Sequence, residues 1–165
     1  MNTSRIELLQ RMPIFGGIAD DALAFLVGQA STRRVARGGE FFREGDEAQA
    51  MFVLESGRVE VVRSWQGSEL VLRQLGAGDC FGEMALLDLF PRSATVRAVD
   101  DCGAIELSSA DLYALYGHDV AQFALIQMNI AREMSRRLRH TDEQWFEARM
   151  RGVVEPSGRA DWPST

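Results

Sequence analysis

Hydrophobic positions recur with helical spacing at both ends of the chain and with strand spacing between them. In residues 4–29 apolar side chains return every three or four positions, which predicts two short helices separated at Pro13. In residues 31–107 short apolar runs alternate with polar positions, and glycine-containing turns such as Ser56-Gly57 separate them. Several short strands at even spacing predict an antiparallel barrel or a jelly roll.

Helical spacing returns at Ser108, which forms the S-x-x-D pattern of a capping box with Asp111. Residues 120–151 contain neither glycine nor proline, so they predict one long helix of roughly 48 Å. An apolar seam runs along this helix and is formed by Phe123, Ile126, Ile130, Met134, Leu138, Thr141 and Trp145. Because the helix is too long for one small barrel, we expect part of the seam to form a homodimer through this C-terminal helix.

Composition limits the class of protein. The 165 residues suit one domain, expected over residues 1–151, followed by a disordered tail at 152–165 that contains prolines, glycine and serine. The longest apolar runs are far shorter than the roughly 20 residues of a membrane span, and the N-terminus lacks the pattern of a signal peptide. Two cysteines do not make a disulfide framework, so we expect a cytoplasmic protein without a membrane partner.

Charge and metal-binding residues exclude further classes. The net charge of −6 argues against a nucleic-acid partner, although the long helix carries several arginines. A jelly-roll metalloenzyme needs several histidine and carboxylate ligands on its strands, but the chain has only His118 and His140. An iron–sulfur sensor needs about four cysteines, and the chain has only two. No nucleophilic triad stands out, so we expect neither a metal nor an enzyme.

One segment, residues 78–98, carries recognisable binding chemistry. It joins a Gly-Glu pair, a short apolar helical turn and a Pro-Arg-Ser step, and it then returns to a strand. Free backbone N–H groups at the start of a helix and an arginine bind an anion, while a carboxylate accepts from a sugar hydroxyl. The segment therefore predicts a site for a phosphorylated sugar.

This segment resembles the phosphate-binding cassette of cyclic-nucleotide-binding domains. Such domains occur in the catabolite activator protein family, in regulatory subunits of cyclic-AMP-dependent kinase and in nucleotide-gated channels. The matching residues are Phe81-Gly82-Glu83, Ala85-Leu86-Leu87, Pro91-Arg92 and Ser93-Ala94-Thr95. A weaker resemblance covers residues 8–149. It implies a mainly β fold with flanking helices: a β-jelly-roll (residues 31–107), N-terminal helices (4–29) and C-terminal helices (108–151).

The resemblance also implies roles within the cassette. Arg92 would bind the cyclic phosphate, although an arginine after a proline turn can simply lie at the surface. Glu83 would accept from the ribose 2′-hydroxyl. Gly82, Met84 and Ala85 would act through their backbone N–H groups, and the neighbouring Ser93 and Ala94 complete the cassette. The Ser93 hydroxyl would donate to the phosphate, and in some family members this position also reads guanine.

Residues outside the cassette are expected around the sugar and the base. Leu72, Phe81 and Val96 are candidates for apolar walls, and ordinary core packing is an equal alternative for each. Arg73 lies on the same strand as Leu72 and either covers the pocket or points outward. By resemblance, Arg137 of the long helix would offset the negative charge of Glu83. Thr141 of the same helix would contact the base. The neighbouring Asp142 differs from the resembled family and leaves the base preference open.

We therefore expect a receptor for a cyclic nucleotide, cAMP more than cGMP, whose C-terminal helix changes conformation on binding. Since no helix-turn-helix segment is evident after residue 151, the signal is expected to pass to a separate effector protein. Two alternatives are a scaffold or dimerisation module that responds to no nucleotide, and a fragment of a transcription activator. The retained Glu83, Arg92 and Ser93 argue against the scaffold.

Overall fold

The computed structural model describes residues 2–87 and 90–152, so the expected tail lies outside the described residues except at its first position. The chain divides into two compact units, Met1–Ile130 and Ala131–Thr165. The first contains the β-structure and the N-terminal helices. The described part of the second is the latter portion of one helix and the turn that follows it.

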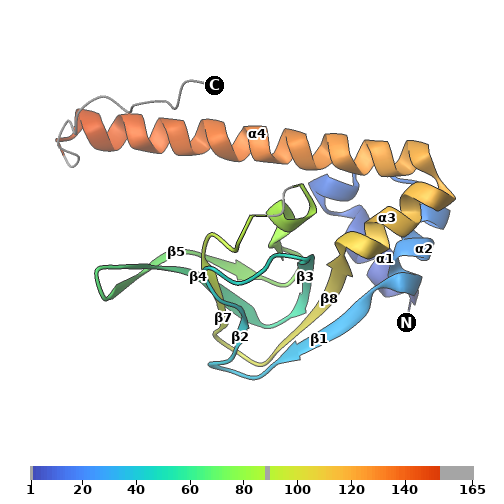
Figure 1. Ribbon diagram of the computed structural model, residues 1–165, viewed down its shortest axis with the longest axis horizontal. Coiled ribbons are helices and arrows are strands. Elements are labelled where there is room, and N and C mark those ends of the chain that lie inside the picture. Colours follow the sequence, from blue (N-terminus) through green and yellow to red (C-terminus); the bar gives the residue numbers. More distant parts are fainter. Residues whose placement is uncertain (1, 88–89, 153–165) are drawn as a thin grey trace. The chain divides into compact units, whose positions relative to one another are not determined.

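Helices flank the β-structure in the sequence, as predicted (Figure 1). They are α1 (Asn2–Gln10), the 3-10 turn η1 (Pro13–Phe15), α2 (Asp20–Gln29), α3 (Ser109–His118) and α4 (Val120–Met150). The capping box is confirmed, because the Ser108 hydroxyl accepts from the Asp111 N–H (3.1 Å) and the Asp111 carboxylate accepts from the Ser108 N–H (2.8 Å). Among the described residues, no helix combines the length and apolar character that a membrane crossing requires.

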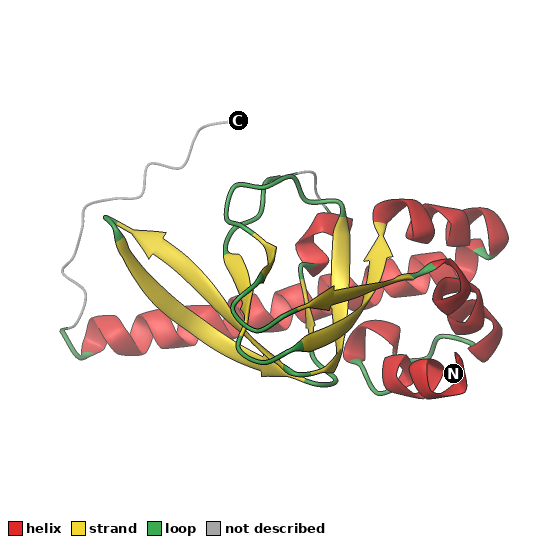
Figure 2. Cartoon of the chain, turned by 90° about the horizontal axis from the view of Figure 1, so that it is seen from below, coloured by secondary structure: helices red, strands yellow, loops and turns green. Residues whose placement is uncertain are grey.

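The strands form two antiparallel four-stranded sheets, which confirms a mainly β, jelly-roll-like fold that helices precede and follow in the sequence (Figure 2). Their order is β1-β8-β3-β6 in one sheet and β2-β7-β4-β5 in the other. The strands are β1 (Ser31–Val35), β2 (Glu40–Phe42), β3 (Ala50–Ser56), β4 (Arg58–Trp65), β5 (Ser68–Gly76), β6 (Cys80–Phe81), β7 (Thr95–Ala98) and β8 (Cys102–Ser108). A short 3-10 turn, η2 (Glu83–Leu86), follows β6.

The core between the sheets is rich in aromatic side chains. Phe41 and Phe81 meet edge-to-face with ring centroids 5.0 Å apart, and Phe52 stacks on Phe81 at 5.4 Å. Such pairs add about 0.5–1.5 kcal/mol each beyond the area that they bury. The aromatic cluster therefore stabilises β6, a strand that lies within residues 78–98.

Two β-bulges determine which side chains face inward. In β2 the pairing passes from Glu40↔Arg97 to Phe42↔Val96, so Phe41 is an extra residue. Both Phe41 and Phe42 consequently pack against the core, although regular alternation would place them on opposite faces. In β5 the pairing passes from Val61↔Arg73 to Val62↔Val71, which makes Leu72 the extra residue.

The first turns of α4 are fixed to the N-terminal segment within the first unit. Asn129 is buried, and its Nδ2 donates to the carbonyl oxygens of Ile14 (3.1 Å) and Gly16 (2.9 Å). The Gln122 side chain accepts from the Ala19 N–H (2.9 Å) at the start of α2. Ile126 and Ile130 are fully buried. The first part of the predicted seam is therefore core of this unit.

Candidate functional site

A cavity opens beside β6 and η2, within the first unit. Its atom-free space is about 550 Å³, counting the part open to solvent. The lining residues are Phe42, Ala48, Val61, Arg73, Phe81, Gly82, Glu83, Met84, Phe90, Pro91, Arg92, Ser93, Ala94 and Val96. Residues far apart in the sequence meet there because β2, β4 and β7 are neighbours in one sheet, while β6 belongs to the other.

Arg92 is the one strongly buried cation among the described lining residues, with 8% of its surface exposed. Its Nη2 donates to the carbonyl oxygen of Ala50 (2.7 Å), and its Nη1 donates to that of Gly82 (3.3 Å). The guanidinium carbon lies 3.9 Å from the centre of the Phe42 ring. The Nε atom is buried and has no hydrogen-bond partner among the described residues. Because an unmet buried donor is costly, this arrangement favours a bound acceptor.

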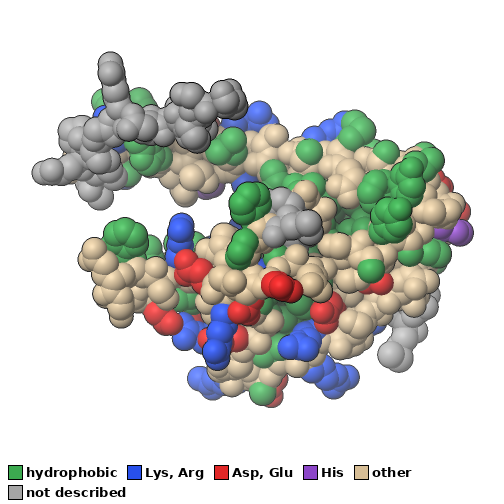
Figure 3. Space-filling view, in the orientation of Figure 1, with side chains coloured by type: hydrophobic (Ala, Val, Ile, Leu, Met, Phe, Trp, Pro, Cys, Tyr) green, Lys and Arg blue, Asp and Glu red, His purple; other side chains and the backbone are tan. Residues whose placement is uncertain are grey.

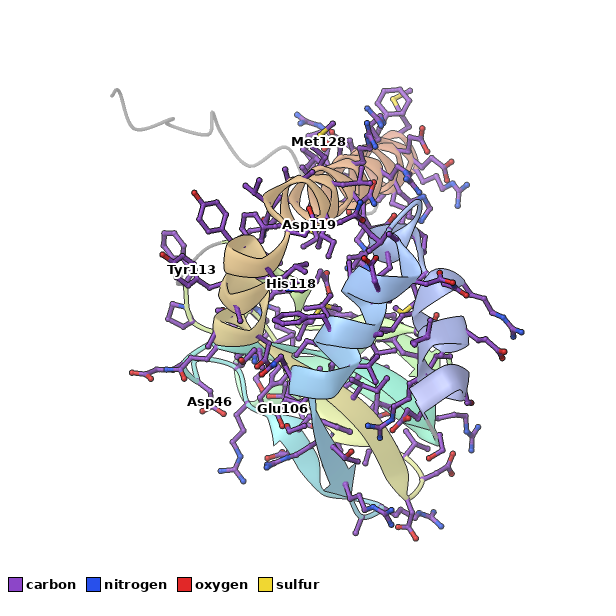
Figure 4. The ribbon with its side chains drawn as sticks, turned by 90° about the vertical axis from the view of Figure 1, so that its right-hand side faces the viewer. Asp46, Glu106, Tyr113, His118, Asp119 and Met128 are labelled. Atoms are coloured by element: carbon purple, nitrogen blue, oxygen red, sulfur yellow. The ribbon has the colours of Figure 1, made fainter. Side chains whose placement is uncertain are left out.

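Burial lowers the pKa of Arg92 from its ordinary value, because a charged guanidinium is poorly solvated inside the protein. The carboxylates of Asp46, Glu106 and Glu83 act in the opposite direction. Figure 4 shows Asp46 in the segment before β3 and Glu106 on β8. An arginine remains cationic at neutral pH in such surroundings, so the cavity keeps a positive charge suited to an anion.

Gly82 lets the backbone pass close to this guanidinium. It precedes η2 with a φ of +75°, in the left-handed region that glycine adopts without strain. A β-carbon at this position would lie 2.7 Å from Nη1 of Arg92 and 3.3 Å from the carbonyl oxygen of Ala50. The absence of a side chain is therefore required by both the turn and the neighbouring arginine.

Eight predicted site residues line the same cavity: Phe81, Gly82, Glu83, Met84, Arg92, Ser93, Ala94 and Val96. Glu83 opens η2 and is buried, with 3% of its surface exposed, whereas Met84 and Ser93 are exposed at the cavity. The cavity thus combines a cation, a carboxylate, a hydroxyl and the start of a helical turn. These groups match the chemistry of a phosphorylated sugar.

Two further predicted residues belong to the first unit. Ala85 belongs to η2, while Leu72 is half exposed and does not line the cavity. The bulge explains this difference, since Arg73 pairs with the cavity-lining Val61 and lines the cavity itself. Of the two residues weighed on this strand, Arg73 rather than Leu72 therefore lies at the site.

Arg137 and Thr141 belong to the second unit. Within α4, Nε of Arg137 lies 3.4 Å from Oε1 of Glu133, and the Thr141 hydroxyl donates to the Arg137 carbonyl oxygen (2.9 Å). All the residues that line the cavity belong to the first unit. The contribution of these two residues to a site therefore stays a prediction.

Several lining residues were not identified from the sequence. Phe42, Ala48, Val61 and Phe90 come from separate segments. The sheet pairing brings Phe42 on β2 and Val61 on β4 to the cavity, whereas Ala48 and Phe90 lie in loops. The consecutive Phe41-Phe42 pair was a usable signal. Two adjacent aromatic residues on a short strand beside a glycine turn indicate a bulge, which turns both inward.

Elsewhere on the first unit, several charged side chains form ion pairs. Arg97 contacts Glu60 (3.1 Å) and Glu69 (2.7 Å), and Figure 3 shows acidic and basic side chains interspersed over the β-structure. Within residues 2–87 and 90–152, no group of three or more histidine, cysteine, aspartate or glutamate side chains is placed to hold a metal ion.

The fold and the cavity define a small-molecule-binding domain, and comparison with known proteins specifies its family. The family model for the cyclic nucleotide-binding domain matches residues 32–119, which include the whole cavity lining. The chain belongs to this family.

Individual relatives support this assignment. The Cyclic AMP receptor protein of Thermus thermophilus is 35% identical over 79% of this chain and 59% of its own length. A putative potassium channel protein of Rhodopseudomonas palustris is 34% identical over 68% of this chain and 27% of its own. The crystal structure of the N-terminal domain of a Streptomyces coelicolor transcriptional regulator superposes with a TM-score of 0.70 and 28% identity, covering 92% of this chain and 96% of that one. The chain therefore spans about three fifths or less of the two full-length relatives.

Proposed function

We propose that this protein is a receptor, rather than an enzyme, for a purine 3′,5′-cyclic nucleotide, and that cAMP is the preferred ligand. The observation that carries the proposal is Arg92, whose guanidinium is buried in the cavity with an unmet N–H donor. A cyclic phosphodiester supplies one negative charge and several acceptor oxygens, which suit that group.

Each lining group has a place in this proposal. Arg92, the backbone at the start of η2 and the Ser93 hydroxyl would bind the phosphate, and Glu83 would accept from the ribose 2′-hydroxyl. Phe81, Val61 and Val96 would supply the apolar walls. The lack of a β-carbon at Gly82 supports the fit, because it leaves the backbone open toward Arg92.

The preference for adenine over guanine is a separate, more specific proposal. It is supported by the name of the Thermus thermophilus relative, the Cyclic AMP receptor protein. Arg73 lines the cavity and carries donors that also suit the acceptors of guanine, so cGMP is the alternative ligand. Thr141 and Asp142 of the second unit are further candidates for contacts with the base.

We further propose that ligand binding shifts the population of α4 conformations through Arg137 and Thr141, and that an effector protein reads the change. The part of α4 up to Ile130 is anchored by Asn129, which suggests that the response is confined to the helix beyond it. A nucleotide-independent dimerisation module is the competing function.

Calorimetric titration of the purified chain distinguishes these functions. We expect saturable 1:1 binding of cAMP, weaker binding of cGMP and no measurable binding of 5′-AMP, since the dianionic open phosphate does not match a site with one buried arginine. We also expect cAMP to raise the thermal unfolding midpoint, because it binds the folded state. Failure of both cyclic nucleotides to bind the wild-type chain would reject the receptor.

Dimerisation through α4 is a separate expectation. In the second unit Leu138 and Trp145 lie on one apolar side of the helix and are 63% and 53% exposed. We expect a dimer in light scattering at micromolar concentration. The double variant Leu138→Glu/Trp145→Glu should be monomeric, because burying charges at an apolar interface is costly. His140→Glu, on the opposite side of the helix, is the control and should remain dimeric; a monomeric wild type would contradict the prediction.

A further inference from the structure

We infer that Phe42 is a positioning residue for the anion site, because its ring supports the Arg92 guanidinium from one face. This inference rests on the proposed function, since it concerns the arginine expected to bind the cyclic phosphate. The guanidinium carbon is 3.9 Å from the centre of the Phe42 ring, within the range of a cation–π interaction, whereas it lies 6.0 Å from that of Phe52.

The β2 bulge creates this arrangement. A regular strand would turn either Phe41 or Phe42 away from the core, but the extra residue in β2 lets Phe41 pack among the core aromatics while Phe42 lines the cavity. Phe42 is itself supported by Phe52 and Phe81, whose ring centres are 5.9 and 6.0 Å away. These two contacts hold the Phe42 ring in place beside the guanidinium.

Contacts in the plane of the guanidinium complete its positioning. The carbonyl oxygens of Ala50 and Gly82 accept from Nη2 and Nη1, while the ring of Phe42 lies against the face. A guanidinium donates its hydrogen bonds in its own plane, so a ring against one face does not compete with the donors at its edge. Nε, which has no hydrogen-bond partner among the described residues, is one of these donors.

An aliphatic residue of similar size would fill the space without supporting the cation. We expect Phe42→Leu to weaken cAMP binding about 3- to 10-fold, which corresponds to the loss of one partly desolvated cation–π contact. Phe42→Trp, which keeps an aromatic face, should bind within about 2-fold of the wild type. Phe25→Leu is the matched control, because Phe25 is also partly buried and stacked, but on His118 at 4.3 Å between α2 and α3.

The thermal unfolding midpoints of the ligand-free variants separate positioning from general destabilisation. We expect Phe42→Leu and Arg92→Met to be coupled, so that the double variant unfolds at a higher temperature than the sum of the two single shifts predicts. Wild-type affinity in Phe42→Leu, or additive shifts, would overturn the inference. If the wild type bound neither cyclic nucleotide, the proposed function would fail, and the midpoints would still decide whether Phe42 holds Arg92.

Discussion

We expect the Arg92→Ala variant to bind 3′,5′-cyclic AMP at least about 100-fold more weakly than the wild type. Removal of one partner from a buried, hydrogen-bonded charge pair costs about 2–5 kcal/mol, and roughly 1.4 kcal/mol corresponds to a factor of ten. Arg92 is the buried cation of the cavity, so no other described lining side chain substitutes for it at the same depth. Calorimetric titration at one ionic strength measures the loss.

The control for this variant is Arg58→Ala. Arg58 is an exposed arginine whose Nε lies 2.7 Å from the Asp100 carboxylate, and it does not line the cavity. Its replacement removes the same charge from the protein but should leave the affinity unchanged, because a surface ion pair contributes little. Equal affinities of Arg92→Ala and the wild type for cAMP would show that the arginine does not bind the ligand.

Gly82→Ala should combine a loss of affinity of about tenfold or more with a lower unfolding midpoint. Alanine at a φ of +75° is strained by roughly 1–2 kcal/mol. Its β-carbon would also lie 2.7 Å from Nη1 of Arg92, so the guanidinium must move away from the carbonyl oxygens of Ala50 and Gly82. Titration with cAMP and thermal unfolding of the ligand-free chain report the two effects separately.

Gly67→Ala is the matched control for the backbone strain. Gly67 has a φ of +80° in the β4–β5 turn, and nothing lies within 4 Å of the place where its β-carbon would be. The two variants should therefore share a similar strain, while only Gly82→Ala displaces Arg92. A Gly82→Ala protein that binds cAMP as tightly as Gly67→Ala does would show that the arginine needs no such room.

Local sequence signals predicted the elements that depend on neighbouring residues. The long helix followed from the absence of glycine and proline over residues 120–151, and the capping box at Ser108 followed from a spacing of three. Residues 78–98 were recognisable because their functional groups are close in the sequence. Arg92 and Glu83 consequently reach one cavity as the spacing predicted.

The sequence did not predict the features that depend on register between strands. Strict alternation gave no reason to prefer Arg73 over Leu72, because the extra residue in β5 is visible only in the pairing with β4. Phe42 was not predicted to line the cavity for the same reason, because the extra residue in β2 is visible only in the pairing with β7. The apolar seam was drawn along the whole long helix and part of it was assigned to a homodimer, but the sequence did not say which part. Ile126 and Ile130 are buried in the first unit, because Asn129 holds these turns against the N-terminal segment.

Among the described residues, those that line the cavity fall between positions 42 and 96, inside one compact unit. A binding cavity confined to so short a stretch can be joined to different flanking segments without a change in its lining, because the lining depends on its own scaffold. Insertion of such a module beside a new effector would require only a suitable junction. Chimaeras that keep residues 42–96 and exchange the flanking helices should therefore retain the phosphate-binding groups while they change what the signal controls.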